Sequence, residues 1–394
     1  MESEQDVVER IDNKYDIIEF KGKGATAWVY LVKDNHTEKL YAGKVLKENN
    51  NLFEKEIKIL AKLKSSNNPY MVNLVDSGVG DIVIANKPTK TKQYLILEYA
   101  PKGELFDYIF CPKKGLQEKY SKVIFTKILK GIQICHNNGI CHRDLKMQNI
   151  LVDEKCNPKI CDFGFATLNS QSLNERLGTP NYAAPEILSG KPYDGFKADI
   201  FSLGVVLLTL VTCKVGFIQA RKNDPFYRWI IAKHYQKYWN TVQDQIFGIS
   251  DQLKKLYIRM VSYRPEERPS IDQILNDEWF NEIRNLNENQ LNDLENEIRD
   301  EFSKREIIVS EESRQNMETN EDSSSYMDET RGGGDDGKEY FDLSLKPKYA
   351  KTGIGMNNYI KIKGNLNPSK FMNSLANKIA EKNENCVIEG SKKS

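Results

Sequence analysis

The segment from His142 to Asn149, which reads HRDLKMQN, constrains this chain more strongly than any other feature. It follows a stretch with helical periodicity and precedes Ile150–Val152, a short apolar run typical of a strand. Thirteen residues after Asn149 comes Asp162-Phe163-Gly164, again behind a short apolar run. The tripeptide alone is a weak signal, because such sequences are most often turns. Five fixed identities within the eight positions of the first segment rarely arise by chance, so the pair is highly specific.

Together these residues resemble the catalytic loop and the metal-binding motif of the eukaryotic protein kinase family. Phosphoryl transfer requires an acceptor hydroxyl held in line, metal ions, and positive charge on the phosphates. The resemblance implies that Asp144 takes the hydroxyl proton and that Lys146 reaches the transferring phosphate of ATP. It also implies that Asn149 and Asp162 supply hard oxygen ligands for Mg²⁺. His142 is expected to be a structural residue that packs beneath the phenylalanine of the metal-binding motif.

Residues 22–29, GKGATAWV, resemble the Gly-rich loop that covers the ATP phosphates in this family. The third glycine of that loop is replaced here by Ala27, which the backbone tolerates if its φ stays negative. A bare hairpin turn is the more frequent meaning of such a segment on its own. The residues expected to contact the nucleotide are Gly22, Lys23, Gly24 and Ala25.

Tyr41-Ala42-Gly43-Lys44 resembles the strand whose lysine holds the α- and β-phosphates, with a glycine in place of the usual isoleucine. The expected partner of Lys44 is Glu56, at the start of Glu-Ile-Lys-Ile-Leu on a predicted helix. Glu54 is the alternative, and it points elsewhere on that helix. Because such charges are usually solvated, only the surrounding motifs favour a functional pair.

Leu95 to Ala100, LILEYA, resembles the last strand of the small lobe and the hinge that receives adenine. Apolar residues around an adenine site also serve as ordinary core, and both roles are expected together. The resemblance places Glu104 at the edge of this site, where basic-substrate kinases meet an arginine upstream of the acceptor. The remaining nucleotide-facing residues implied by the resemblance are Val29, Ala42, Leu97, Glu98, Ala100 and Leu151.

Residues 178–186, GTPNYAAPE, match the end of the family's activation segment. The resemblance implies that Thr179 bridges the catalytic aspartate and lysine, and that Glu186 pairs with Arg268. It also implies that Asp199 caps the backbone of the catalytic loop. Lys146 and this segment fit serine/threonine kinases, and the hinge looks most like the calcium/calmodulin-dependent group. Within that group, residues 217–239 resemble members from ciliate-like protists.

Regulation is indicated by Arg143, because an arginine before the catalytic aspartate usually grips an activation-loop phosphate. The place of that phosphothreonine, three residues before Gly178, holds Glu175. We expect the Glu175 carboxylate to pair with Arg143 without phosphorylation; the alternative is a solvated loop glutamate. Glu104 predicts a mild preference for basic residues upstream of the acceptor, because the second acidic position of strongly basophilic kinases is Gln148 here.

The pattern along the chain predicts the two-lobed α+β fold of the family. Alternating residues predict strands over residues 15–46, near 72–78 and near 94–98, and a helix is expected over 51–64. A small five-stranded antiparallel lobe with one main helix is thus followed by a larger, mostly helical lobe. The expected boundaries are 1–13 (N-terminal extension), 14–99 (first lobe), 100–281 (second lobe), 282–340 (acidic linker) and 341–394 (C-terminal segment).

Beyond the second lobe, residues 290–308 carry apolar side chains at helical spacing and predict an amphipathic helix. Residues 311–337 are acidic, Ser-rich and almost free of aliphatic side chains, so we expect a linker that does not order itself. Residues 341–394 are basic and patterned. They read either as a small kinase-associated-like module that contacts acidic lipid heads or the kinase itself, or as a solvated basic tail.

Composition excludes several other classes of protein. A net charge of +1 over 394 residues does not favour a nucleic-acid partner. No signal peptide and no run of about 18 apolar residues is evident, and the seven scattered cysteines suggest reduced cytoplasmic thiols. We expect a monomeric cytoplasmic enzyme that acts on protein substrates. A pseudokinase that scaffolds partners is the alternative, and the intact set of motif residues argues against it.

Overall fold

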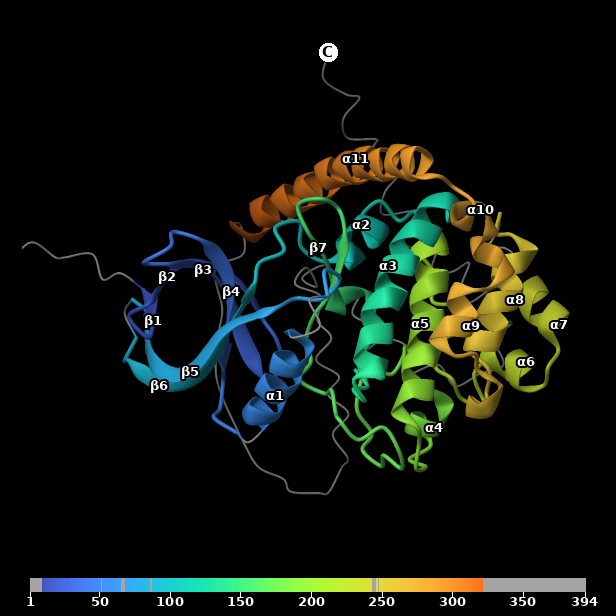
Figure 1. The fold of residues 1–394 in the computed structure, drawn as a ribbon, viewed down its shortest axis with the longest axis horizontal. Coiled ribbons are helices and arrows are strands. Elements are labelled where there is room, and N and C mark those ends of the chain that lie inside the picture. The colour runs from blue at the N-terminus through green and yellow to red at the C-terminus, as the bar shows by residue number, and fades with distance from the viewer. Residues whose placement is uncertain are drawn as a thin grey trace, which may run out of the picture.

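The computed structural model describes residues 9–50, 52–64, 68–85, 87–242, 246 and 248–321. Within them the chain forms a small lobe built on a sheet and a larger helical lobe (Figure 1). This is the two-lobed α+β arrangement predicted from the sequence. The expected C-terminal segment 341–394 lies outside the described residues.

The small lobe is a closed barrel of antiparallel strands in the order β1-β2-β3-β4-β6-β5. The residue pattern predicts five strands, and the additional one is β1, which pairs with β2 and β5. A strand of two residues is too short to show alternation, although its Ile11 is completely buried. The strand bounds are Arg10–Ile11 (β1), Tyr15–Lys23 (β2), Ala27–Asp34 (β3), Leu40–Leu46 (β4), Leu74–Val83 (β5) and Lys90–Glu98 (β6).

The β5–β6 hairpin extends further than the predicted spans of residues 72–78 and 94–98. Its outer part is held by polar cross-strand contacts, such as the 2.7 Å hydrogen bond from Thr91 to Asp81. Polar pairs of this kind stabilise neighbouring strands without apolar alternation. A Lys-rich stretch therefore conceals strand residues from a search for hydrophobic periodicity.

Helix α1 (Leu52–Lys64) packs against the barrel through the stripe that its sequence predicts. Phe53, Leu60 and Leu63 are buried, and Ile57 is partly buried beside them. On the same helix Glu56 is buried as well, although a glutamate is rarely so unless it is paired. The packing of α1 thus directs a carboxylate toward Lys44 on β4.

The larger lobe surrounds α5, which is buried along nearly its whole length. By length and composition α5 could cross a membrane, but 78% of it is buried inside the lobe, as in a core helix. Residues from α3, α5 and α8 belong to one continuous core. The helix bounds are Leu105–Phe110 (α2), Glu118–Asn137 (α3), Pro185–Leu188 (α4), Gly195–Thr212 (α5), Tyr227–Ile231 (α6), Tyr235–Val242 (α7), Asp251–Met260 (α8), Ile271–Leu275 (α9), Asn281–Arg284 (α10) and Glu288–Glu321 (α11).

A small two-stranded sheet positions both motif segments at the junction of the lobes. β7 (Ile150–Val152) follows the catalytic loop directly, and β8 (Pro158–Ile160) precedes Asp162 by two residues. The two strands are antiparallel, with Ile150 opposite Ile160. Because the motifs flank this short hairpin, its register brings them to the same end of the sheet.

Helix α11 is longer than predicted and lies along the larger lobe past α3 and α2 (Figure 1). It begins at Glu288 and continues to Glu321, into the stretch expected to be an unordered linker. Residues 309–321 include four Glu and contain no Gly or Pro, so nothing in this stretch breaks the helix.

Candidate active site

Lys44, on β4, is the centre of a chain of charges that joins α1 to the segment after β8. Its Nζ atom lies 2.7 Å from Glu56 Oε1 and 3.0 Å from Asp162 Oδ1. Glu54, the alternative partner in the sequence, is exposed and faces Lys58 at 3.9 Å. Lys44 therefore connects β4 and α1, which follow one another in the chain, to a segment 118 residues further on.

These ion pairs set the protonation states of the cluster. Burial alone lowers the pKa of Lys44, but the attraction of Asp162 and Glu56 outweighs it and raises the pKa above its ordinary value. The positive charge of Lys44 in turn lowers the pKa of Asp162 to about 2. At neutral pH the lysine is a cation and the aspartate an anion, as phosphate and metal binding require.

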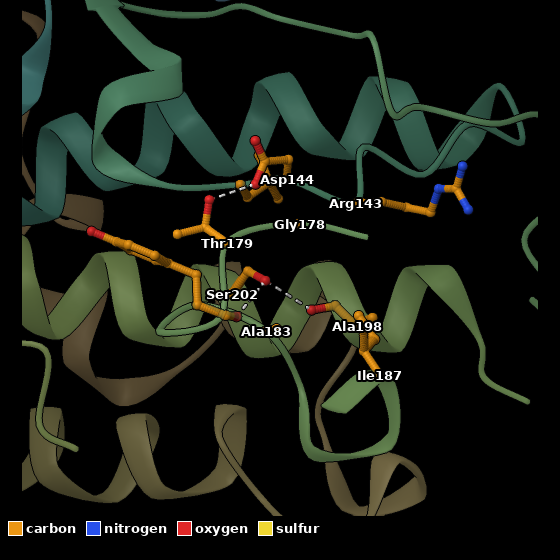
Figure 2. Close-up of a pocket in the computed structure, with 10 residues that line it drawn as sticks. Arg143, Asp144, Gly178, Thr179, Ala183, Ile187, Ala198 and Ser202 are labelled. Carbon is orange, nitrogen blue, oxygen red and sulfur yellow. Dashed lines mark hydrogen bonds between the residues drawn. The ribbon is translucent and has the colours of Figure 1, made fainter. Parts of the chain in front are cut away.

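The loop of residues 142–149 brings three of the candidate side chains together, and Thr179 joins them from a later segment. Lys146 Nζ donates to Asp144 Oδ2 at 2.7 Å and to Thr179 Oγ1 at 3.0 Å. Thr179 Oγ1 donates to Asp144 Oδ1 at 2.9 Å (Figure 2). Asn149 Nδ2 donates to Asp144 Oδ2 at 3.0 Å and to its backbone oxygen at 2.8 Å. Both carboxylate oxygens of Asp144 are therefore oriented by neighbours.

The backbone of this loop is fixed by α5. The carboxylate of Asp199 accepts hydrogen bonds from the N–H groups of His142 and Arg143, each at 2.8 Å. The His142 ring packs against Phe163, with centroids 4.9 Å apart. Arg143 and Asp162 have φ values of 68° and 62°, a left-handed conformation that costs a residue other than glycine about 1–3 kcal/mol. Such strain concentrates at functional sites, where the surrounding contacts maintain it.

The Gly-rich segment forms the turn between β2 and β3. Gly24 N donates to Ala27 O at 2.8 Å, which closes the turn. Ala27 is buried and has no positive φ, so the replacement of the third glycine causes no backbone strain. Lys47, which the sequence patterns do not single out, donates to Ala25 O at 2.7 Å and also to Gly24 O. Gly22 and Lys23, at the end of β2, pair with Val29 and Trp28 of β3.

The candidate adenine-facing apolar residues lie on β3, β4 and β6 of the small lobe and on β7. Ala42 pairs with Leu97 across β4 and β6, and Val29 is paired with Lys44. Leu151, on β7, forms a β-bridge with Glu104 at the start of α2. The partly exposed side chains in this set are Val29, Ala42, Leu97 and Leu151.

The hinge residues lie directly after β6. Glu98 N donates to Asn73 O at 2.9 Å, so its carbonyl is the backbone group that it can offer to a base. Its side chain is held by Lys159 Nζ at 2.5 Å and by Asn73 Nδ2 at 2.8 Å. Ala100 O accepts from Gly103 N at 3.3 Å and closes the turn into α2.

The activation segment is held at its end by a buried ion pair. Arg268 has a completely buried side chain and donates to both carboxylate oxygens of Glu186, at 2.6 and 2.8 Å. A small cavity lies where this segment meets the catalytic loop, lined among others by Arg143, Asp144 and Thr179 (Figure 2). The arrangement gives the segment after Thr179 a fixed position beside Asp144.

Arg143 makes the contact with Glu175 that the spacing predicts. Arg143 Nη1 donates to Glu175 Oε2, and Arg143 Nε donates to Phe165 O at 2.7 Å. The arginine side chain is 2% exposed, whereas that of the glutamate is 58% exposed. Burial opposes the charge of Arg143, but the hydrogen bond to Glu175 contributes to raising the pKa of the arginine. Tyr193 Oη donates to the backbone oxygen of Glu175 at 3.1 Å.

The residues that form this site lie in a region that matches a known protein family. Residues 15–280 match the family described as the protein kinase domain. The chain belongs to this family. The matched region contains every candidate site residue and ends before α11 begins.

Curated relatives of this protein kinase domain come from plants and animals. The chain is 33% identical over 280 residues to CBL-interacting serine/threonine-protein kinase 13 of Arabidopsis thaliana, which covers 68% of this chain and 51% of the relative. It is 32% identical over 281 residues to NUAK family SNF1-like kinase 1 of Homo sapiens, with 69% and 39% covered. CBL-interacting protein kinase 16 of Oryza sativa subsp. japonica is 31% identical over 291 residues, with 71% and 59% covered. The chain thus spans about half the length of the curated relatives it matches.

The donor set of this protein kinase domain fits Mg²⁺ in complex with a nucleotide. Both N–H bonds of the Asn149 amide go to Asp144, so the amide oxygen is the atom that can serve as a ligand. The side chain of Asp162 is 49% exposed. Among the contacts of the described residues it binds Lys44 through Oδ1, so Oδ2 is the oxygen suited to a metal ion. Over the described ranges no three His, Cys, Asp or Glu side chains cluster as a metal site of their own. Mg²⁺ usually takes only one or two protein oxygens and completes its coordination with phosphates and water.

Proposed function

We propose that this chain is a protein serine/threonine kinase that transfers the γ-phosphate of Mg-ATP to a hydroxyl of a protein substrate. The observation that carries the proposal is that the Lys44–Glu56–Asp162 cluster lies beside the Asp144–Lys146–Asn149 cluster. The β7–β8 hairpin brings Asp162 to the same end as Asn149, and Lys44 and, less strongly, Lys146 lower the pKa of Asp162. The names of the curated serine/threonine kinase relatives support the choice of acceptor.

In the proposed reaction the acceptor oxygen forms a bond to the γ-phosphorus, and the bond from that phosphorus to the β–γ bridging oxygen breaks. Asp144 accepts the hydroxyl proton, and the products are ADP and a phosphorylated side chain. The contacts from Lys146, Thr179 and Asn149 hold the Asp144 carboxylate in one orientation. Such positioning provides much of the catalysis in phosphoryl transfer.

Positive charge around the phosphates comes from two lysines. Lys44 is fixed by two carboxylates and is suited to hold the α- and β-phosphates, while Lys146 stands beside the catalytic aspartate. Mg²⁺, when bound through Asn149 and Asp162, would supply further neutralisation of charge on the phosphates. The N–H groups of the Gly-rich turn are suited to cover the phosphates from the small lobe.

We infer that the activation segment is competent without phosphorylation. The support is the contact between the buried Arg143 and Glu175, which stands where a phosphothreonine would otherwise be gripped. A carboxylate carries less charge than a phosphate but can form the same charge-assisted hydrogen bond. The Arg143–Glu175 pair and the Tyr193 hydrogen bond then hold the loop in place.

For substrates, we propose a mild preference for basic residues upstream of the acceptor, which Glu104 at the start of α2 would bind.

We also propose that the chain belongs to the calcium/calmodulin-dependent group of kinases, which the hinge sequence supports. Contact of the basic C-terminal segment with acidic lipids is a separate proposal that rests on its charge alone.

The test is incorporation of radiolabelled phosphate from Mg-ATP into a generic basic protein. Wild type is expected to label the substrate, and Asp144→Asn to reduce kcat by roughly 10²–10⁴. Asp153→Asn, just after β7 and outside the site, is the matched control and is expected to retain activity. An inactive wild type, or an Asp144→Asn variant as active as wild type, would reject the proposed function.

A further inference from the structure

Helix α11 lies outside the matched kinase domain, yet it is built into the larger lobe. Leu294, Ile298 and Phe302 are buried in the main core. Acidic residues of α11 face lysines of α3, with Glu297 at 2.5 Å from Lys119 and Glu295 at 2.6 Å from Lys127. The apolar stripe and these charge pairs fix the helix against α3.

Among the side chains of α11 that the structure describes, up to Val309, the most deeply buried polar one is Arg305, which is 4% exposed. Its guanidinium donates to three backbone carbonyls, Tyr108 O at 2.8 Å, Lys114 O at 2.6 Å and Gly115 O at 2.9 Å. Glu301, one turn earlier, balances its charge at 2.8 Å. Burying a guanidinium costs free energy unless its N–H groups are hydrogen-bonded and its charge is paired. The three carbonyls and Glu301 meet both conditions for Arg305.

These three carbonyls belong to the end of α2 and to the loop that follows it. The last carbonyls of a helix have no partners within the helix and carry partial negative charge, so a buried cation there is favourable. The far side of the same loop is held by α5, because Leu116 N donates to Leu210 O at 2.8 Å. The end of α2 and its loop are thus held by α5 on one side and by Arg305 of α11 on the other.

Two neighbours of Arg305 extend the contact toward the hinge. The Phe302 ring stacks on the buried Tyr108 ring of α2, with centroids 4.9 Å apart. Glu306 accepts from Lys102 Nζ at 2.5 Å, and Lys102 lies in the turn between the hinge and α2. The same turn is tied to β7 through Lys102 N and Val152 O at 3.2 Å.

We propose that Arg305 is a positioning residue for nucleotide binding, acting through α2 and the hinge turn from outside the kinase domain. Arg305 itself makes no hydrogen bond to a residue expected to contact the nucleotide. It fixes the element that begins at Leu105, next to Glu104, and its neighbour Glu306 fixes the turn after Ala100. This inference rests on the proposed function, because it assigns Arg305 a role in ATP binding.

The test separates KM for ATP from kcat in the full chain. Arg305→Met keeps the apolar stem and removes all donors, and it is expected to raise KM for ATP by about 3- to 30-fold with a smaller change in kcat. Arg305→Lys should recover part of the loss. Glu306→Gln, which changes a half-exposed side chain, should raise KM in the same direction by a smaller factor.

Glu297→Gln is the matched control, since it breaks an ion pair of the same helix that faces α3 rather than α2. It should leave KM for ATP unchanged. All variants are assayed well below their thermal midpoints, and Mg-ADP affinity is measured by calorimetry as an independent readout.

An active wild type whose Arg305→Met and Glu306→Gln variants bind ADP like Glu297→Gln would overturn the inference. If Arg305→Met does not fold, Glu306→Gln decides alone. An inactive wild type would count against the proposed function instead.

Discussion

The buried guanidinium of Arg143 donates a hydrogen bond to the exposed carboxylate of Glu175. This contact joins the catalytic loop to the activation segment with groups that the unmodified chain already contains. The same arginine precedes Asp144, so the position of the segment that holds Glu175 is coupled to Asp144 by one residue.

Replacing Glu175 with Gln is therefore expected to lower kcat by about 5- to 30-fold, which corresponds to a coupling of 1–2 kcal/mol. The buried Arg143 would keep a hydrogen-bond acceptor but lose its counter-charge. Wild type should be active with the loop shown by mass spectrometry to be unphosphorylated. Glu38→Gln, on an exposed turn of the small lobe, is the control and should be unchanged. A wild-type chain that is inactive until Ser170, Ser172 or Thr179 is phosphorylated would contradict this account.

The Glu186–Arg268 pair is expected to contribute to stability rather than to chemistry. Removing one member of a buried pair leaves the other uncompensated, so Glu186→Gln should lower the free energy of unfolding by about 3–5 kcal/mol. Chemical denaturation measures this directly. The exposed pair of Lys254 and Asp251 offers a control, because solvent screens it and Asp251→Asn should change the free energy of unfolding much less. Equal effects of the two substitutions would count against a structural role for the buried pair.

Asp162 should make stability depend on pH on the acid side. Its folded pKa of about 2, lowered by Lys44, lies below the unfolded value of about 3.9. The contribution is present above the unfolded pKa and is lost as pH falls toward the folded pKa. Asp162→Asn should therefore show a shallower fall in unfolding free energy between pH 5 and pH 3 than wild type. Identical slopes would show that the ion pair with Lys44 has no effect on folding.

Glu104→Gln is expected to reduce the preference for arginine upstream of the acceptor while leaving turnover of a neutral peptide nearly constant. The reason is that an ionised carboxylate strengthens a hydrogen bond to a guanidinium. A positional peptide library compared between wild type and variant measures it. Indifference of the wild type to upstream arginine would remove the predicted specificity.

Much of the candidate site can be predicted from the sequence because each proposed chemical role requires a fixed residue type at a fixed spacing. Lys44, Asp144 and Asp162 could be placed this way, and Glu175 followed from counting back from Gly178. Such motifs specify local geometry and chemistry at once, which makes them informative without a structure.

Other features left no readable pattern. Strand β1 is too short to alternate, and the outer β5–β6 hairpin is stabilised by polar pairs. Arg305 is one of four basic residues in an otherwise acidic helix, and nothing in its neighbourhood along the chain predicts three carbonyl partners. Lys47 directly follows β4 and reaches the Gly-rich turn only once that strand has folded into the barrel. Contacts between distant segments depend on tertiary packing, which spacing along the chain does not encode.

The most direct test of the central claim is to identify the phosphorylated residue in a set of peptides that differ only in a Ser, Thr or Tyr acceptor. With Mg-ATP the wild-type chain is expected to add one phosphate to the Ser or Thr peptide, detected by mass spectrometry, and Asp144→Asn is expected to add almost none. Absence of transfer by the wild type, or transfer to Tyr alone, would contradict the account.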